Sequence, residues 1–230
     1  MFPQRSGKDA SSGRRPAAMT AAATAVVLAG GVGRRLGGPA PKQLIEVAGR
    51  PILAYSIEAF DATPDIDEVI VVMAPGHEDA AAEIARPFAK VRAVISGGDS
   101  RTESTLRAMD NLAGAPDDAR VLFHDAARPF VDAAIIARCL EALRSYDAVA
   151  VAVPTADTVV EVAHDQVVAM PRRDALRRFQ TPQAFRLGTL RKAYELALAD
   201  PSFMATDDCG VVHRYLPDVP IRVVAGDERN

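Results

Sequence analysis

Residues 28–42 read LAGGVGRRLGGPAPK and form the most informative stretch of the chain. The stretch overlaps a short apolar, β-branched run, TAVVLA at 24–29, which predicts a buried parallel strand. That strand runs straight into Gly30, Gly31 and Gly33. Glycines there let backbone N–H groups approach a polyphosphate closely, because no Cβ intervenes. The stretch therefore predicts a phosphate-binding turn at the end of a strand.

Three basic side chains, Arg34, Arg35 and Lys42, lie in the same stretch. A triphosphate under attack needs such charges, because negative charge grows on the leaving pyrophosphate and must be neutralised. The alternative is an ordinary strand-to-helix turn with solvated arginines. The two arginines and the Pro–Lys pair at this spacing argue against that alternative. Two common glycine motifs do not fit, because GxxxxGK[ST] is absent and Leu36 replaces the last glycine of GxGxxG.

Apolar runs on both sides of the glycine stretch predict an α/β fold with a Rossmann-like, mostly parallel twisted sheet flanked by helices. Further strands are expected at 68–73, 91–95, 121–124, 148–153 and 221–224. Helices are expected at 51–60, where Pro51 takes the first helical position, and at 101–112, 132–143 and 187–198. Strands alternate with helices, which is typical of βαβ units.

The alternation stops after Pro154, where two β-like runs, DTVVEV at 157–162 and QVVAM at 166–170, surround a His–Asp turn. They predict a β-hairpin arm at about 155–172, inserted in the α/β core. Residues 1–23 are polar, basic and rich in small residues, and we expect a disordered tail. The remaining 24–230 are expected to form one domain that carries the arm.

Composition excludes several classes of protein. The 230 residues carry a formal net charge of −3, so the chain has no global basic field with which to hold nucleic acid. The two cysteines, Cys139 and Cys209, belong to no CxxC pair, and we expect buried thiols rather than a zinc site or a disulfide. No apolar run is long enough to span a bilayer, and no secretory signal is evident. We therefore expect a cytoplasmic protein.

The glycine stretch resembles the nucleotide-binding motif of the sugar-phosphate nucleotidyltransferases. Four further motifs narrow the resemblance to the cytidylyltransferases that act on 2-C-methyl-D-erythritol 4-phosphate or D-ribitol 5-phosphate. These motifs are GGDSRTES at 97–104, FHDAARPF at 123–130, ADTV at 156–159 and FQTPQAF at 179–185. Five motifs in the family's order span the chain from about residue 24 to its end. The resemblance implies CTP and a polyol phosphate as substrates, a Mg²⁺ ion as cofactor, and a homodimer formed through the arm.

The resemblance also implies roles for individual residues. Arg35 and Lys42 match the pair that stabilises the triphosphate and the transition state. Asp125 matches the acidic residue near the magnesium, and Arg128 follows it in the same motif, on the side of the acceptor. Thr158 and Arg173 match residues of the arm that hold the acceptor's phosphate. The remaining matches bind the nucleotide, the first group at its phosphates and the second at cytosine: Leu28, Ala29, Gly30, Gly31 and Gly33; Gly97, Gly98, Asp99 and Ser104.

The residue chemistry agrees with several of these roles. Asp125 follows a predicted strand at its C-terminal end, where ligands of parallel sheets collect, and a carboxylate there suits Mg²⁺. The alternative for Asp125 is a capping or turn carboxylate. His124 is a formal candidate for a general base, but a phosphate nucleophile is already ionised, and we expect a packed or hydrogen-bonded side chain instead. Arg173 lies in an arginine-rich run, for which a solvated basic face is the alternative.

Two departures from the family's pattern bear on the substrate and the chain end. The methylerythritol enzymes often have a PAAG-type loop and a lysine after the Asp–Thr pair, whereas this chain has LAGG and DTVVEV, closer to the ribitol group. We therefore favour ribitol 5-phosphate, with methylerythritol phosphate as the alternative, which HDAARP supports. Both groups carry a lysine in a KVT-like strand that would follow GDERN. The resemblance thus implies a longer native chain, and in some relatives a short-chain dehydrogenase-type reductase domain follows.

Two competing functions remain open. A degenerate CTP-binding module would bind the nucleotide without turnover, although the retention of Arg35, Lys42 and Asp125 argues against it. A transferase for another base, such as a molybdopterin guanylyltransferase, would share the glycine stretch. The GGDSRTES and TPQAF motifs argue against that second alternative. A cytidylyltransferase that proceeds by in-line displacement at the α-phosphorus of CTP is the function that the sequence favours.

Overall fold

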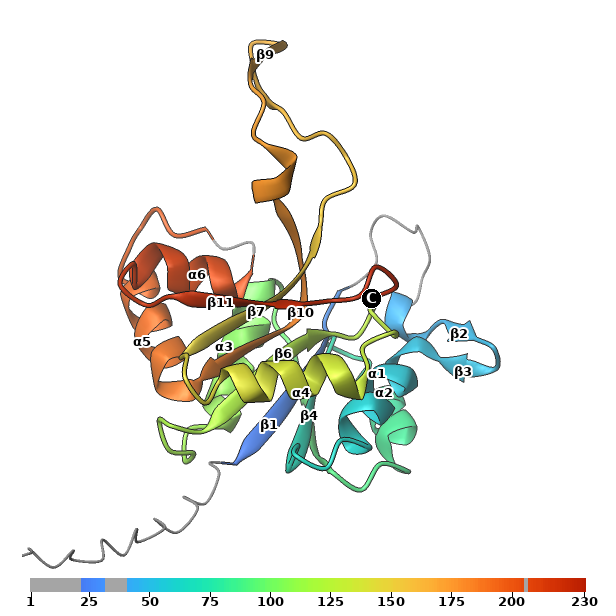
Figure 1. Ribbon diagram of the computed structural model, residues 1–230. Helices are drawn as coiled ribbons and strands as arrows, with labels where there is room; N and C mark the ends of the chain where they lie inside the picture. Colours follow the sequence, from blue (N-terminus) through green and yellow to red (C-terminus); the bar gives the residue numbers. More distant parts are fainter. Residues whose placement is uncertain (1–21, 32–40, 205–206) are drawn as a thin grey trace, which may run out of the picture.

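The computed structural model describes residues 22–31, 41–204 and 207–230 (Figure 1). In these residues a seven-stranded sheet has the order β11-β7-β10-β6-β1-β4-β5. All neighbouring strands are parallel except at β10, which is antiparallel to both β6 and β7. The sheet strands are β1 (Ala23–Ala29), β4 (Glu68–Met73), β5 (Val91–Ser96), β6 (Arg120–Asp125), β7 (Ala148–Pro154), β10 (Arg177–Arg186) and β11 (Ile221–Ala225). The predicted α/β class with a mostly parallel sheet is confirmed.

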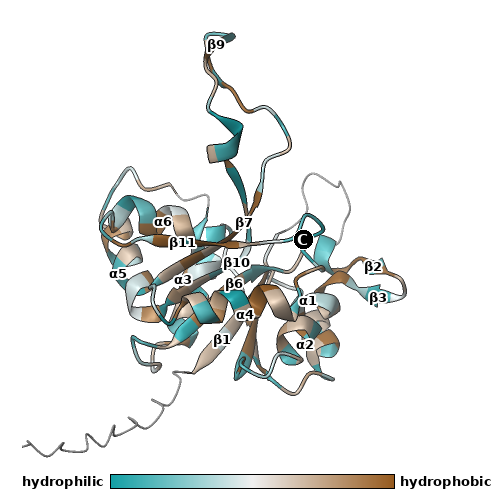
Figure 2. Cartoon of the chain, in the orientation of Figure 1, coloured by the Kyte–Doolittle hydropathy of each residue, from teal (hydrophilic) through white to brown (hydrophobic). Residues whose placement is uncertain are grey.

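Helices cover both faces of the sheet, which explains why β1 is apolar throughout rather than alternating. Ala25 and Val27 of β1 pack in one core with α1 (Ile52–Asp61), α2 (Glu78–Ala85) and α4 (Ala133–Ala142). Val26 and Leu28 pack in the other core with α3 (Arg101–Asn111), α5 (Leu187–Leu198) and α6 (Asp208–Tyr215). Figure 2 shows the apolar colour gathered along the central strands between these helices. The two cores fix the sheet, and with it the strand ends that carry the site.

Three helices begin at capping side chains that the sequence places one residue before the apolar periodicity. Ser100 caps α3 by accepting a hydrogen bond from the Glu103 N–H at 3.1 Å. Asp132 caps α4, and Asp207 caps α6, each from the residue before the helix. Such caps satisfy backbone donors that the first turn leaves without partners. The predicted helices at 101–112 and 132–143 are therefore found, with ends that differ by about one residue.

The hairpin arm is present, but it is shorter in regular structure than predicted. Its strands are β8 (Glu161–Ala163) and β9 (Gln166–Ala169), joined by His164 and Asp165, whose positive φ angles of 49° and 60° suit a tight hairpin turn. Residues 157–160 form no strand, so that part of the prediction is wrong. The excursion from the sheet lasts from the end of β7 to the start of β10 and includes the 3₁₀ turn Arg173–Ala175. In Figure 1 the arm projects away from the sheet.

Several elements escaped the sequence analysis, among them β10 and α2. Strand β10 contains Pro182, a residue that usually excludes a central strand because it cannot donate to the ladder. The sheet accommodates it by a register shift between Gln180 and Gln183 in the pairing with β7. Helix α2 is short and rich in alanine, so it lacks the apolar periodicity that identified the other helices. Pro51, expected as the first helical residue, lies just before α1, in the two-residue strand β3 (Arg50–Pro51) that pairs with β2 (Glu46–Val47).

Among the described residues, no helix has the length and apolar character needed to cross a membrane. Both cysteines are buried free thiols in this part of the chain, as expected.

Candidate active site

A cavity of about 800 Å³ opens at the C-terminal ends of β1 and β6. Adjacent parallel strands end there together, because Leu28 of β1 pairs with Asp125 of β6. The lining includes most of the predicted nucleotide and catalytic residues that the structure describes. They are Leu28, Gly30, Gly31, Lys42, Gly98, Asp99, Ser104, Asp125 and Arg128. Motifs that are up to 100 residues apart in the sequence thus meet in one cavity.

The Ser104 hydroxyl organises the wall predicted to read cytosine. It accepts a hydrogen bond from the Gly98 N–H at 3.2 Å and donates one to the Ser100 carbonyl at 3.0 Å. A Cβ on Gly30 would lie 3.2 Å from the Ser104 oxygen, and a Cβ on Gly97 would lie 3.0 Å from it. Both glycines thus approach the Ser104 side chain closely, and the three predicted residues Gly30, Gly97 and Ser104 do come together.

The loop that precedes α3 is held by Glu103. Its carboxylate accepts a hydrogen bond from the Asp99 N–H at 2.6 Å, and a Cβ on Gly98 would lie 2.1 Å from the Glu103 Cβ. Asp99 lines the cavity. Ser100 and Glu103 thus form a capping pair that fixes the backbone of 97–99 against the start of α3. This local geometry leaves backbone groups of the loop at the edge of the cavity.

Lys42 lies on the other side of the cavity, in the 3₁₀ turn Lys42–Leu44. The next side chain, Gln43, is buried and donates a hydrogen bond to the Ala29 carbonyl at the end of β1. This contact anchors the turn, and a Cβ on Gly31 would lie 3.7 Å from the Lys42 Cε. The Gln43 Oε1 atom is buried and has no hydrogen-bond partner among the described residues. Lys42 is therefore positioned beside the glycines, as the sequence predicts. Gly33 and Arg35, with Arg34, lie outside the described residues, and their roles stay predictions.

Asp125 lies at the end of β6 and forms ion pairs with two arginines. Its Oδ1 accepts from Nη1 of Arg101 at 2.8 Å, and its Oδ2 lies 3.7 Å from Nε of Arg128. Arg128 also donates to the Asn230 carbonyl at 3.2 Å. The sequence analysis named Asp125 and Arg128 but missed Arg101, which is part of the GGDSRTES motif. Its position within that motif was the signal that could have identified it.

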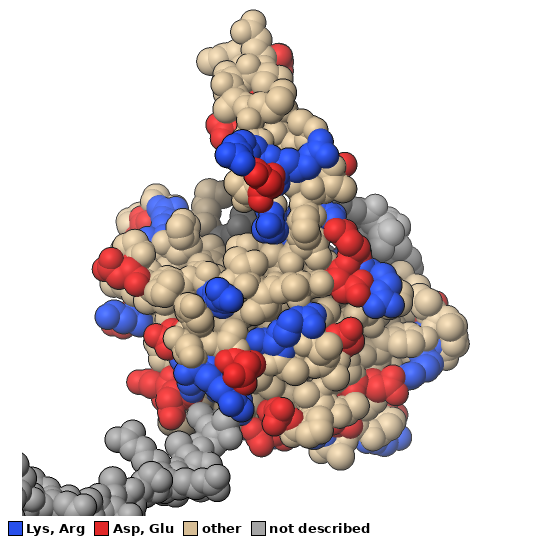
Figure 3. All heavy atoms as spheres, viewed as in Figure 1, with Lys and Arg blue, Asp and Glu red and all other residues tan. Residues whose placement is uncertain are grey.

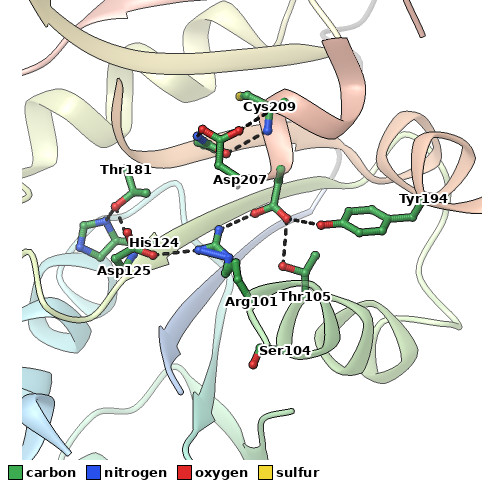
Figure 4. A network of polar contacts seen from close by, with 12 residues as sticks. Arg101, Ser104, Thr105, His124, Asp125, Thr181, Tyr194, Asp207 and Cys209 are labelled. Atoms are coloured by element: carbon green, nitrogen blue, oxygen red, sulfur yellow. Dashed lines mark hydrogen bonds and ion pairs between the residues drawn. The ribbon is translucent and has the colours of Figure 1, made fainter. Parts of the chain in front are cut away.

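His124 is buried and has a structural role, as the sequence analysis expected. Its Nε2 lies 3.0 Å from the Arg128 carbonyl, which can only accept, so Nε2 carries the proton. Burial lowers the pKa of His124 to about 4, so the ring is neutral at pH 7 and Nδ1 is an acceptor. Thr181 therefore donates to Nδ1 at 3.0 Å and accepts from the Asp125 N–H at 3.1 Å. Figure 4 shows the hydrogen-bonded side chains of His124 and Thr181 beside Asp125.

Mg²⁺ usually takes one or two carboxylates together with phosphate oxygens and water. The described residues contain no cluster of three or more His, Cys, Asp or Glu side chains that could hold a metal. Asp125 does present a carboxylate to the cavity, and its Oδ2 makes only the looser of the two ion pairs described above. These groups fit an ion that arrives with a triphosphate better than an ion held by the protein alone.

The two predicted acceptor ligands of the arm lie elsewhere. Nη2 of Arg173 donates to the Thr158 hydroxyl at 2.9 Å, so the structure brings this pair together. Both side chains are exposed, and neither lines the cavity of the same chain. The arm of one chain therefore does not complete its own site.

Gly30, Gly31, Lys42 and a polar wall surround one cavity at the ends of parallel strands, an arrangement typical of the nucleotide-binding site of an α/β protein. The comparison with protein families is more specific. Residues 23–230 match the model of 2-C-methyl-D-erythritol 4-phosphate cytidylyltransferase (IspD), and the chain belongs to this family. It is therefore an enzyme of the CTP-dependent nucleotidyltransferase type.

Individual relatives agree with the family match. The chain is 48% identical over 223 residues to 2-C-methyl-D-erythritol 4-phosphate cytidylyltransferase of Thermobifida fusca, an alignment that covers 94% of this chain and 90% of that protein. It is 38% identical to the bifunctional ribulose 5-phosphate reductase/CDP-ribitol pyrophosphorylase Bcs1 of Haemophilus influenzae, with 89% of this chain and 44% of that protein covered. The crystal structure of 4-diphosphocytidyl-2C-methyl-D-erythritol synthase from Anaerococcus prevotii superposes with a TM-score of 0.81, 29% identity and 92% coverage of each chain. The preference for ribitol 5-phosphate that LAGG and DTVVEV suggested is therefore not favoured, and the methylerythritol alternative is better supported.

We predict that Gly97→Ala weakens CTP binding at least about tenfold, or about 1.4 kcal/mol. Its Cβ would lie 3.1 Å from the backbone carbonyl of Met73, which already accepts the Gly97 N–H at 2.6 Å and cannot withdraw easily. Gly114→Ala is the control, because a Cβ there meets nothing within 4 Å. Titration calorimetry with CTP measures both variants. Equal affinity for Gly97→Ala and wild type would show that this loop does not border the nucleotide.

We predict that His124 makes the protein less stable as the pH falls from about 6.5 to about 4. The folded pKa is depressed, so the stabilisation is complete above the unfolded value of about 6.5 and is lost through this window, by at most about 3 kcal/mol. His124→Gln keeps an N–H donor for the Arg128 carbonyl and removes the titration. Urea unfolding at several pH values should show a flatter pH dependence for the variant. An unchanged slope would assign the acid sensitivity to other groups.

Proposed function

We propose that the protein transfers the cytidylyl group of CTP to 2-C-methyl-D-erythritol 4-phosphate and releases pyrophosphate. The observation that carries the proposal is the match of residues 23–230 to that family, together with 48% identity to a relative of that name. The cavity supports it, because Lys42, the Ser104 wall and Asp125 surround one space of nucleotide size. Transfer to ribitol 5-phosphate is the second candidate, supported by the similarity to Bcs1.

The geometry suggests how the substrates are arranged. Cytosine lies against the loop at 97–104, and the phosphates lie over Gly30 and Gly31 beside Lys42. The acceptor phosphate then enters next to Asp125 and Arg128. One of its oxygens attacks the α-phosphorus of CTP, so a new P–O bond forms while the bond to the β-phosphate oxygen breaks. The leaving pyrophosphate takes the electron pair of that bond, and Lys42 is placed to stabilise its growing charge.

No proton needs to be removed from the attacking phosphate oxygen at neutral pH. This agrees with His124, which is buried, neutral and engaged at both ring nitrogens. Catalysis then depends on positioning and on electrostatic stabilisation. Mg²⁺, when bound with the triphosphate near Asp125, would neutralise phosphate charge.

The proposal predicts faster turnover with methylerythritol phosphate than with ribitol 5-phosphate. Pyrophosphate release with CTP and each acceptor measures this, and kcat/KM should differ by at least about tenfold, or about 1.4 kcal/mol. Lys42→Ala should lower turnover about a hundredfold, because it removes a contact to the leaving group. Lys192→Ala, a surface change on α5, is its control. A preference for ribitol phosphate would overturn the acceptor assignment, and CTP binding without any turnover would favour a non-catalytic module.

We also propose that the arm completes the site of a second copy in a homodimer. Thr158 and Arg173 form a polar pair on the arm and lie away from their own cavity, so only another chain can use them there. Exposed apolar side chains on the arm support a contact with protein, and Figure 3 shows its far end largely free of charged side chains. They are Val162, Val167, Val168 and Met170, which are 59–67% exposed. A fused reductase domain, by contrast, stays a prediction.

The dimer proposal predicts complementation between two inactive variants. Lys42→Ala damages the cavity, and Arg173→Ala damages the arm. Mixed dimers would contain one intact site, so random mixing should restore about a quarter of the sites. Arg172→Ala, a neighbouring arm residue that pairs with Asp174, is the control and should retain activity. If the mixture is no more active than its components at limiting acceptor, the arm does not act across subunits.

A further inference from the structure

Arg101 links the cavity to a carboxylate that solvent does not reach. Its Nη1 donates to Asp125 Oδ1 at 2.8 Å, and its Nη2 donates to Oδ2 of Asp208. The exposed fraction of the side chains is 0% for Asp208, 24% for Arg101 and 41% for Asp125. Arg101 thus joins a buried carboxylate to one that lines the cavity, and Figure 4 shows its side chain pointing toward Asp125. Neither Arg101 nor Asp208 has a role in the proposed reaction so far.

We propose that Arg101 is a positioning residue, which holds the Asp125 carboxylate in its reactive orientation and is itself fixed by Asp208. The proposal rests on the cytidylyltransferase activity and does not depend on which polyol phosphate is the acceptor. It concerns the side chain of Asp125 only. The backbone of Asp125 is held separately, through its N–H and the Thr181 hydroxyl.

Asp208 is held more firmly than a single ion pair would require. Its Oδ1 accepts hydrogen bonds from the Tyr194 hydroxyl at 2.7 Å and from the Thr105 hydroxyl at 2.9 Å, while Oδ2 accepts from Arg101. Two donors from α3 and one from α5 therefore converge on one carboxylate. Asp208 also begins α6, whose capping residue Asp207 accepts from the Gln183 amide at 3.0 Å. The anchor for Arg101 is consequently tied to three helices and to β10.

An arginine is suited to this bridge for a geometric reason. Its planar guanidinium offers two Nη groups in a fixed relation, so one side chain can orient two carboxylates at once, whereas lysine presents a single point charge. Burial by itself would lower the pKa of Arg101, but the charges of Asp208 and Asp125 outweigh that effect and raise it. The guanidinium therefore stays charged, and its direction is set from the buried side.

Stability alone does not explain the arrangement. A buried ion pair recovers little more than its desolvation cost, and well-packed apolar residues of similar volume often stabilise a protein equally well. What the charged arrangement adds is a defined orientation of Asp125 at the cavity. The competing explanation is that Arg101, which also lines the cavity, touches a substrate directly. The two explanations differ in whether the effect of Arg101 passes through Asp125.

A double-mutant cycle separates the two explanations. The paired substitution Arg101→Met with Asp208→Leu removes both charges without leaving one buried and unpaired, and is compared in the wild-type and Asp125→Asn backgrounds. We expect kcat/KM for the acceptor to fall about thirtyfold in the first background and less than about threefold in the second, because the effect passes through Asp125. CTP affinity should change less than about threefold in both. Equal losses in the two backgrounds, or no loss in the first, would overturn the proposal.

Conservative variants provide a second measurement if the paired substitution fails to fold. Arg101→Lys keeps the positive charge but loses the two Nη donors of the planar guanidinium. Tyr194→Phe removes one hydrogen-bond donor to Asp208. Both should lower kcat/KM in the wild-type background and not in Asp125→Asn, and full activity of Arg101→Lys would contradict the proposal. A similar cluster on the surface, Arg214–Asp200–Tyr215, is the matched control. Arg214→Lys and Tyr215→Phe should leave kcat/KM unchanged. Wild-type turnover is first measured with both polyol phosphates, so that a wrong acceptor assignment is recognised separately.

Discussion

The parallel pairing of β1 with β6 is the constraint on which the site depends. It sets Leu28 beside Asp125, and the Ala126 N–H continues the pairing by donating to the Leu28 carbonyl at 2.9 Å. Gly30 and Asp125 therefore lie at adjacent strand ends, although almost 100 residues separate them in the sequence. Because helices cover both faces of the sheet, a ligand can approach at the strand ends, where the cavity opens.

Around this pairing, some side chains line the cavity, and others are buried behind them and hold them in place. Lys42 and Asp125 face the cavity, whereas Gln43, His124 and Asp208 are buried behind them. Each of these buried groups is itself held by hydrogen bonds: Gln43 donates to the Ala29 carbonyl of β1, His124 accepts from Thr181 of β10, and Asp208 accepts from Arg101 of α3. Fixed donors and charges of this kind need little reorganisation during the reaction, which suits a transfer that depends on electrostatic positioning.

The sequence predicted the parallel sheet well because its strands are continuous apolar runs bounded by turns, as in β4 and β7. It could not predict β10, since Pro182 argues against a central strand and only the tertiary pairing shows how the sheet accommodates it. Family motifs identified Lys42, Ser104 and Asp125, and all three line the cavity. The sequence did not identify Arg101, because its contact with Asp208 joins residues that are 107 positions apart. Sequence separation alone does not show that two residues meet in the interior.

The predicted arm residues Thr158 and Arg173 lie away from the cavity of their own chain. Arg173 and Thr158 are paired with each other on the arm, and their contact with the acceptor phosphate stays a prediction. Their distance from the cavity has a physical reason, since a two-stranded hairpin has no core of its own and projects from the sheet (Figure 1). Such a hairpin with exposed valines is stabilised when another surface covers it. In the proposed dimer, the contact that buries the arm would also deliver its polar pair, so acceptor binding would be coupled to association.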